Sequence, residues 1–373
     1  MKFKKLLMLL FIPIFLTGCE WNFELYDPSD QGGFEQETPA IPGDGKINVI
    51  NPSNYNGTIT YAPTTQTLLS KEEVYEQCVT STVYITGMVE EGMVLGSGVV
   101  FSEDSNYAYI FTNAHVVTGA TSIEVTYSNL KKSGATIVGF NVLEDVAVLS
   151  VSKNNNYSIA TLQVTDNLKV GMEVLAIGTP ASTEYNFTAT AGIISKLDSP
   201  ITSVYDNNYS LLMIQTDASL NNGNNGNSGG PLFDLYGNLI GINSMKLLYD
   251  DSYNAIDDIN FSIPMDRAVF MANSFFENKP YTRGKLGITI VDISDITLTD
   301  KTSYNITLDY GIYVLESTNA LFKLNDVVTK INGIEFKSKI QFQKELFKYY
   351  KNDQIEFTVY RNGQYITFNA TLS

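Results

Sequence analysis

Three residues of this 373-residue chain could together carry out nucleophilic catalysis: Ser228, His115 and Asp145. A serine hydroxyl is a weak nucleophile until a neighbouring base accepts its proton. His115 is the only histidine in the chain, so it is the only imidazole available as that base. A carboxylate on the far side of the imidazole would hold it in the required tautomer. This combination predicts acyl transfer through a covalent serine intermediate.

Ser228 lies in the glycine-rich stretch Asn225-Gly226-Asn227-Ser228-Gly229-Gly230-Pro231. Glycines allow a tight turn that points backbone N–H groups toward the oxygen that becomes negatively charged during the reaction. We expect this oxyanion hole in the segment Gly226, Asn227 and Ser228, with Gly226 and Ser228 as donors. The alternative is a plain Gly/Asn surface turn, but the apolar strands that follow make the pattern too specific for an incidental loop.

The choice of the orienting carboxylate is less direct. Asp145 stands at the head of an apolar strand, residues 146–151, and we choose it over its neighbour Glu144. In isolation, a solvated acidic turn would be the simpler interpretation. Asp217 is the rival, but it lies so close to Ser228 in sequence that we expect it to have a structural role.

The elements that position these residues are short strands. The chain holds 23 Tyr and 20 Phe, and residues 81–268 alternate short apolar runs with Gly and Asn turns. This pattern predicts a mainly β fold, as a sandwich or a pair of barrels. Residues 283–373 form a smaller α+β module, with an amphipathic stretch at 340–349 and an Asn362-Gly363 hairpin turn.

The N-terminus determines the expected compartment. Lysines precede an apolar run, residues 6–16, that is too short to span a bilayer and is typical of a signal peptide. Leu16-Thr17-Gly18-Cys19 resembles the lipobox of bacterial lipoproteins. We therefore expect a signal peptide at 1–18, a lipid on Cys19, and a protein anchored at the extracytoplasmic face of the cell membrane. The alternative is an ordinary signal peptide with an incidental cysteine.

Residues 19–68 are rich in Gly and Pro and predict a flexible tether. Ser70-Lys71-Glu72-Glu73 matches a capping box at the start of a short helix. Cys78 on that helix is expected to be a small buried apolar residue and not a catalytic thiol.

Several classes of function are disfavoured. The formal net charge of −16 lacks the basic footprint of a nucleic-acid binder. We find no metal-ligand spacing and no nucleotide-binding loop in the sequence, so no metal and no cofactor are expected.

Together, these residues resemble the HtrA family of trypsin-like serine proteases from Ser70 to the C-terminus. The resemblance rests on three blocks in the order His, Asp, Ser: Thr112-Asn113-Ala114-His115-Val116-Val117, Asp145-Val146-Ala147-Val148-Leu149, and Gly226-Asn227-Ser228-Gly229-Gly230-Pro231-Leu232. It implies a chymotrypsin-like double β-barrel at 69–277 that cleaves unfolded or misfolded extracytoplasmic proteins. Proteins of this family often form trimers, so a homotrimer is a further expectation from the resemblance.

The C-terminal module, 278–373, resembles the PDZ domain of the same family. Arg283-Gly284-Lys285-Leu286-Gly287-Ile288 is similar to its carboxylate-binding loop. The resemblance implies that backbone N–H groups of Leu286, Gly287 and Ile288 hold the C-terminus of a peptide, which adds to the sheet edge as a strand.

One departure motivates a second hypothesis. Asn221-Asn222-Gly223 and Asn224-Asn225-Gly226 form an apparent three-residue insertion before the serine, which puts the specificity pocket and the oxyanion hole in question. The alternative function is therefore an inactive or latent scaffold that binds peptides.

Overall fold

The computed structural model describes residues 55–373, apart from residues 91, 181–182, 204–205, 221–225 and 247–257. The predicted signal peptide 1–18, Cys19 and the predicted tether as far as residue 54 lie outside the described residues. The same holds for residues 221–225 of the repeated triplet. In the described part of the chain, no helix has the length and apolar character needed to cross a membrane.

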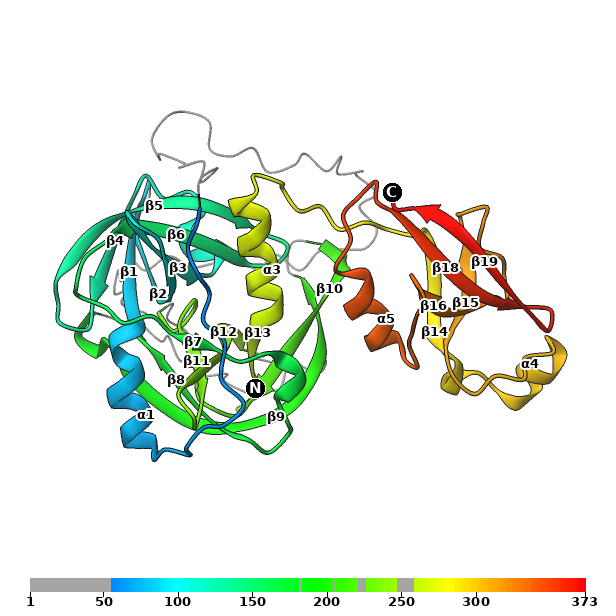
Figure 1. The fold of residues 1–373 in the computed structure, drawn as a ribbon, viewed down its shortest axis with the longest axis horizontal. Helices are drawn as coiled ribbons and strands as arrows, with labels where there is room; N and C mark the ends of the chain where they lie inside the picture. Colours follow the sequence, from blue (N-terminus) through cyan, green and yellow to red (C-terminus); the bar gives the residue numbers. More distant parts are fainter. Residues whose placement is uncertain (1–54, 91, 181–182, 204–205, 221–225, 247–257) are drawn as a thin grey trace, which may run out of the picture. The chain divides into compact units, whose positions relative to one another are not determined.

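The first barrel is closed, with the strand order β1-β2-β3-β6-β5-β4 (Figure 1). Strands with apolar residues at alternate positions bury one face, and here the buried faces meet inside the barrel. Ile85, Ile110 and Leu149 are fully buried members of this core. The strands are β1 Thr82–Val89, β2 Gly92–Glu103, β3 Tyr107–Thr112, β4 Ser122–Tyr127, β5 Lys132–Asn141 and β6 Val146–Ser152.

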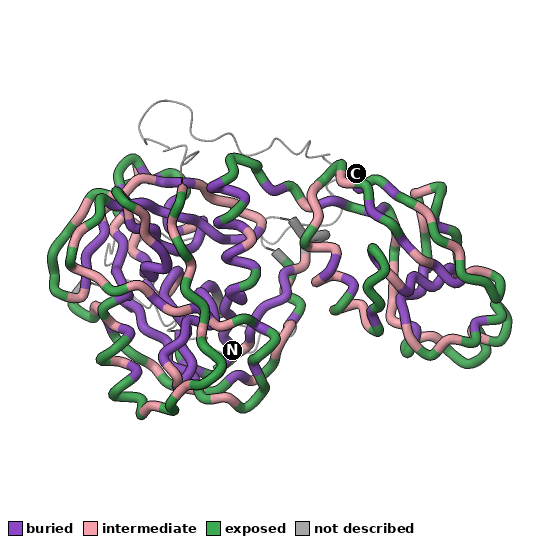
Figure 2. The backbone as a smooth tube through the Cα atoms, in the orientation of Figure 1, coloured by how far each residue is buried: buried purple, intermediate pink, exposed green. Residues whose placement is uncertain are grey.

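The second barrel is built from a seven-stranded sheet in the order β11-β8-β9-β10-β13-β12-β7, and β11 also pairs with β12. That additional pairing closes six of the strands into a ring, so the predicted double barrel is confirmed. Buried stretches follow the strands of both barrels (Figure 2). The strands are β7 Thr161–Leu162, β8 Glu173–Gly178, β9 Thr188–Ser203, β10 Asp206–Thr216, β11 Pro231–Asp234, β12 Asn238–Lys246 and β13 Asn260–Pro264.

Helix α3, Met265–Phe276, follows β13 directly and packs on β5 and β6 of the first barrel as well as on β12 (Figure 1). Gly139 of β5 makes room for it, because a Cβ there would come within 2.5 Å of the Phe275 ring. The helix therefore joins the two barrels. The remaining helices before it are α1 Lys71–Cys78, α2 Ala114–Val117 and the 3₁₀ turns η1 Val79–Ser81, η2 Thr165–Asn167 and η3 Thr183–Tyr185.

Helix α1 begins as the sequence predicts. The Ser70 hydroxyl accepts the N–H of Glu73, and the Glu73 carboxylate accepts the N–H of Ser70. Cys78 at its end is buried, and its thiol donates to the carbonyl of Gly237. Burial, with a smaller effect of Asp234, raises the pKa of this thiol to about 12. A thiol that stays protonated is unreactive, which agrees with the structural role predicted for Cys78.

The segment before α1 lies along the barrels, although the sequence places it in the flexible tether. Tyr55 stacks on Phe276 of α3 with ring centroids 3.8 Å apart, and its hydroxyl is 2.8 Å from that of Ser102 in β2. Thr60 and Ala62 exchange two 2.8 Å backbone hydrogen bonds with Leu162 of β7. We call residues 55–62 the strap. Its aromatic and backbone contacts outweigh the Gly- and Pro-rich composition that suggested a tether.

The C-terminal domain is a sheet in the order β14-β15-β16-β18-β19, with β17 paired to β16. Asn362 and Gly363 have φ values of 50° and 84° and connect β18 to β19, as expected for a two-residue hairpin turn. Helix α5 covers residues 340–346 of the predicted amphipathic stretch and ends before residues 347–349. The elements are β14 Ile288–Asp292, η4 Ile293–Asp295, α4 Leu298–Ser303, β15 Ile312–Ser317, β16 Val327–Ile331, β17 Ile334–Glu335, α5 Lys339–Leu346, β18 Gln354–Arg361 and β19 Gln364–Thr371.

Candidate active site

His115 lies in the single turn of α2, directly after β3. Its Nδ1 is 2.9 Å from Oδ1 and 3.1 Å from Oδ2 of Asp145, and its backbone N–H donates to Oδ1 over 3.2 Å. An Nδ1–H that donates to a carboxylate leaves Nε2 as the proton acceptor. No described residue bonds Nε2, and 33% of the side chain is exposed. The imidazole is therefore oriented at one end and accessible at the other.

Asp145 stands in the turn that leads into β6 and is 6% exposed. Besides the two bonds from His115, its carboxylate accepts a 2.7 Å hydrogen bond from the hydroxyl of Ser244. The Asn113 side-chain amide donates to its backbone carbonyl over 2.9 Å. A carboxylate with so many donors cannot rotate freely, so it holds the ring of His115 in one orientation.

The charge of Asp145 also sets the proton affinity of His115. Burial of the imidazole lowers its pKa, because removal from water disfavours the charged form. The charge of Asp145 and its hydrogen bond together outweigh burial, so the pKa of His115 is raised above 6.5. The arrangement thus stabilises the imidazolium that forms when the ring accepts a proton.

Ser228 lies in a loop that both barrels hold. The N–H of Ser97 in β2 donates to its carbonyl, and the N–H of Gly229 donates to Asn243 in β12, each over 2.8 Å. Gly229 has φ 83°, and a Cβ there would lie 2.3 Å from the Ser97 carbonyl oxygen. Only glycine fits, because the backbones approach too closely for a side chain.

The Ser228 hydroxyl is 3.2 Å from the backbone carbonyl of Ser244, to which it donates. Within the part of the chain that the structure describes, no hydrogen bond joins Ser228 to His115. The connection between them runs through Ser244, whose carbonyl accepts the Ser228 hydroxyl and whose own hydroxyl donates to Asp145. Ser244 thus contacts both Ser228 and Asp145, and Asp145 in turn bonds to His115. Catalytic hydrogen bonds are often long or misaligned without substrate, so this geometry remains compatible with catalysis.

The predicted oxyanion donors lie in the same loop. Among the described residues, the N–H groups of Gly226 and Ser228 have no acceptor. Gly226 packs so closely on Thr179 that a Cβ would come within 1.8 Å of its carbonyl oxygen. The carbonyl of Gly226 accepts hydrogen bonds from the Ser97 hydroxyl and from the N–H of Thr179. The carbonyl of Gly226 therefore anchors the loop to Ser97 and Thr179.

Sequence reasoning did not assign a role to Ser244 or to the Asn113 amide. Asn113 lies in the histidine block of the family resemblance, so proximity to a motif was the only signal for it, and Ser244 lies outside the three blocks. The rival carboxylate, Asp217, accepts the N–H of Ile193, which lies within β9, over 2.6 Å. This backbone contact agrees with the structural role that we expected for Asp217. No group of three or more His, Cys, Asp or Glu side chains in the described segments is arranged to hold a metal ion.

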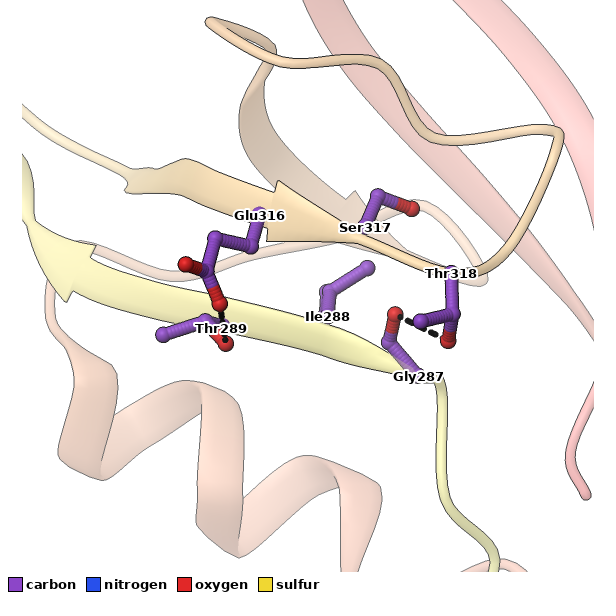
Figure 3. Close-up of a pocket in the computed structure, with 6 residues that line it drawn as sticks. All are labelled: Gly287, Ile288, Thr289, Glu316, Ser317 and Thr318. Atoms are coloured by element: carbon purple, nitrogen blue, oxygen red, sulfur yellow. Dashed lines mark hydrogen bonds between the residues drawn. The ribbon is translucent and has the colours of Figure 1, made fainter.

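The second predicted site lies at the start of β14. Gly287 has φ 66°, and its carbonyl accepts both the N–H and the hydroxyl of Thr318, over 2.8 and 3.1 Å. The Asn319 amide donates to the carbonyl of Leu286 over 3.2 Å. Among the described residues, the N–H groups of Leu286 and Gly287 have no acceptor. An open hollow of about 340 Å³ adjoins this loop (Figure 3), lined by Gly287, Ile288, Thr289, Glu316, Ser317 and Thr318.

A double barrel that gathers a serine, a histidine and an aspartate defines a trypsin-like peptidase. Comparison with protein families agrees: residues 96–242 match the trypsin-like peptidase domain, and residues 284–372 match the PDZ domain. The chain is therefore a serine endopeptidase of trypsin-like fold with a C-terminal PDZ domain.

Relatives define the family. The serine protease Do-like HtrA of Lactococcus lactis subsp. cremoris is 32% identical over 289 residues, which cover 74% of this chain and 70% of that protein. Serine protease Do-like HtrB of Bacillus subtilis is 34% identical over 289 residues, covering 74% of this chain and 62% of the relative. The chain belongs to the HtrA family of serine proteases.

Solved structures support the same assignment. The structure described as HtrA-type protease AlgW with tripeptide superposes with a TM-score of 0.65 at 28% identity, covering 82% of this chain and 97% of that chain. The serine endoprotease from Yersinia pestis gives a TM-score of 0.53 at 27% identity, covering 84% and 98%. The resemblance and the fold class predicted from the sequence are thereby confirmed.

Proposed function

We propose that this chain is an extracytoplasmic endopeptidase that cleaves unfolded or misfolded proteins through Ser228, His115 and Asp145. The observation that carries the proposal is the contact between His115 and Asp145. Both the ring and the backbone N–H of His115 bond to the Asp145 carboxylate, with Nδ1 2.9 Å from Oδ1. It adjoins a serine loop held by both barrels. These are the parts that acyl transfer needs: a nucleophile, a base and a group that orients the base.

In the proposed reaction, the Ser228 hydroxyl turns from the Ser244 carbonyl toward Nε2 of His115, which accepts its proton as Oγ attacks the peptide carbonyl. Asp145 stabilises the resulting imidazolium. The N–H groups of Gly226 and Ser228, with Asn227 between them, bind the oxyanion. His115 then gives its proton to the leaving amine, and water hydrolyses the acyl-enzyme by the same steps.

The loop at Leu286, Gly287 and Ile288 is proposed to bind the carboxylate of a peptide C-terminus. Support comes from the N–H groups of Leu286 and Gly287, which have no acceptor among the described residues, and from the adjoining hollow. The peptide would pair with the free edge of β14, which is the end strand of its sheet.

The proposed location is the extracytoplasmic face of the cell membrane. It rests on the apolar leader and on the lipobox-like sequence before Cys19. A relative from Halomonas elongata, 34% identical over 293 residues, is named a probable periplasmic serine endoprotease, DegP-like. A homotrimer is proposed on the family resemblance alone. The proposed domain limits are 69–277 for the protease and 278–373 for the PDZ domain.

The test is cleavage of casein by the fragment Asp44–Ser373, which retains the strap, beside its Ser228→Ala variant. We expect cleavage by the first and a loss of about 10⁴-fold or more in the second. Equal cleavage by both would refute the role of Ser228. Circular dichroism of the variant controls for folding.

A second candidate is a latent protease or a peptide-binding scaffold. The observation that favours it is the Ser228 hydroxyl, which bonds to the carbonyl of Ser244 and not to His115. A serine-reactive phosphonate separates the two functions. Labelling that needs Ser228 supports the endopeptidase, whereas no labelling, with or without added C-terminal peptides, supports the scaffold.

A further inference from the structure

A buried ion pair lies directly beside the candidate catalytic residues. Glu144 is fully buried, and the side chain of Arg267 in α3 is 6% exposed. Arg267 Nε donates to Glu144 Oε2, and Nη2 forms an ion pair with the same oxygen. The ring of Phe347 covers the guanidinium, with its centroid 4.1 Å away. Two charges removed from water in this way must stay paired, because an unpaired charge there would be strongly destabilising.

Glu144 immediately precedes Asp145, and the backbone between them is strained. Asp145 has φ 53°, a left-handed conformation that residues with a side chain seldom adopt. Such a conformation persists when the surroundings impose it. The Asn141 side chain accepts the N–H of Glu144 over 3.1 Å, and Asn113 holds the carbonyl of Asp145. The ion pair with Arg267 fixes the side chain of Glu144.

The second barrel and its helix therefore hold this turn at two successive positions. Ser244 in β12 bonds to Asp145, while Arg267 in α3 bonds to Glu144. These anchors belong to one body, because α3 continues from β13 and β13 pairs with β12, with Asn243 opposite Ser262. A shift of the turn relative to that body would have to break both contacts.

We propose that Glu144 and Arg267 are positioning residues, whose ion pair holds the turn against α3 and so aims the Asp145 carboxylate at His115. Neither touches the reacting atoms. The inference rests on the proposed function, in that it assumes that these three residues carry the reaction.

The test replaces both partners, as Glu144→Met/Arg267→Met, so that no unpaired charge remains buried. We expect kcat to fall by about 10²-fold, the scale of a displacement of roughly 1 Å, while KM changes little. Nuclear magnetic resonance gives a second readout, because His115 is the only histidine. Its pKa, which Asp145 raises, should fall in the variant as the carboxylate moves away.

The control removes an ion pair of the PDZ domain whose carboxylate is buried and whose arginine is 23% exposed. Arg361 binds Asp326, which is fully buried, with Nε 2.6 Å from Oδ1. Asp326→Asn/Arg361→Met should lower the melting temperature without moving the pKa of His115. If the Glu144/Arg267 variant behaves in the same way, with kcat and the pKa of His115 unchanged, its pair is merely structural and the proposal is overturned.

Two further outcomes are decisive. If the double variant does not fold, Arg267→Lys keeps the charge but loses the forked geometry, and a lower kcat with a lower His115 pKa supports the proposal. Unchanged values in that variant overturn it. If the wild type shows no turnover that depends on Ser228, the proposed function fails, but the pKa of His115 in the variants still decides whether the pair positions Asp145.

Discussion

The hydroxyl of Ser244 donates a 2.7 Å hydrogen bond to Oδ2 of Asp145, although 99 residues separate them in sequence. Asp145 belongs to the turn before β6 of the first barrel, and Ser244 to β12 of the second. The bond therefore crosses between the barrels at the position where the imidazole must be oriented. The same residue's backbone carbonyl accepts the hydroxyl of Ser228. Ser244 thus contacts two of the three residues proposed to carry the reaction.

Replacing Ser244 with alanine should lower kcat by about 10- to 150-fold, since a hydrogen bond to a charged group contributes roughly 1.5–3 kcal/mol. KM for a peptide substrate should change little, because the hydroxyl contacts Asp145 and not the substrate. Steady-state kinetics measures both. Ser262→Ala is the control, because Ser262 is also a buried serine, in the adjacent strand, and its hydroxyl bonds to Asn243. An equal loss of kcat in both variants would contradict a specific role for Ser244.

The raised pKa of His115 predicts opposite effects of pH on activity and on stability. The base must be neutral, so kcat/KM should rise with pH through a folded-state pKa above 6.5. The protonated ring is the form that Asp145 stabilises. Its contribution to the free energy of unfolding is fully present below 6.5 and is lost as pH rises through the folded pKa. Magnetic resonance of the single imidazole and a pH–rate profile check both statements.

Asp145→Asn is the matched variant for this pH prediction. It removes the charge and leaves the burial, so the pKa of His115 should drop below 6.5. Turnover should fall by about 10⁴-fold, as expected when the imidazole loses its orienting carboxylate. A pKa that stays raised in this variant would show that another group controls the proton affinity of His115.

Gly287→Ala should weaken binding of C-terminal peptides at the PDZ domain. Gly287 has φ 66°, and an added Cβ would lie 2.6 Å from the Thr318 hydroxyl that bonds its carbonyl. The loop must therefore shift, and this would displace the N–H groups that are proposed to bind the peptide carboxylate. We expect at least about a 10-fold rise in Kd by fluorescence anisotropy, with little change in casein cleavage. Gly333→Ala is the control: it also has positive φ, 78°, but open space around it.

Tyr55→Ala should destabilise the protease domain by about 2 kcal/mol, because it removes an aromatic stack and a hydrogen bond to Ser102. Urea unfolding of the fragment Asp44–Ser373 measures the change. Tyr61→Ala removes a neighbouring tyrosine that is 50% exposed and should have a much smaller effect. If the two variants are equally stable, the side chain of Tyr55 does not anchor the strap.

The parts of this protein that could be predicted from sequence are those that depend on nearby residues. The capping box at Ser70 and the Asn362-Gly363 turn need only a few neighbours, and both are present. The serine loop could be recognised because glycines in a short span are required for its backbone. Asp145 could be placed at the head of a strand because the apolar run that follows it, residues 146–151, is also local.

Contacts across long sequence separations could not be predicted where no recognised motif marks the partners. Arg267 and Glu144 are 123 residues apart, and nothing in either local sequence indicates that they pair. Charged residues are usually exposed, so both would have been placed at the surface. The strap was missed for a related reason: its composition is that of a linker, while its contacts come from β2, β7 and α3.

The strap also determines how mechanical load enters the protein. Any tension applied to the chain before Tyr55 reaches residues 55–62 before it reaches a barrel strand. Those residues are held by a ring stack on Phe276 and by paired backbone bonds at Leu162, which lie on different elements. Detaching them would disturb helix α3, which joins the barrels and carries Arg267, the partner of Glu144. Tension at the N-terminal side would therefore perturb the structure close to Asp145.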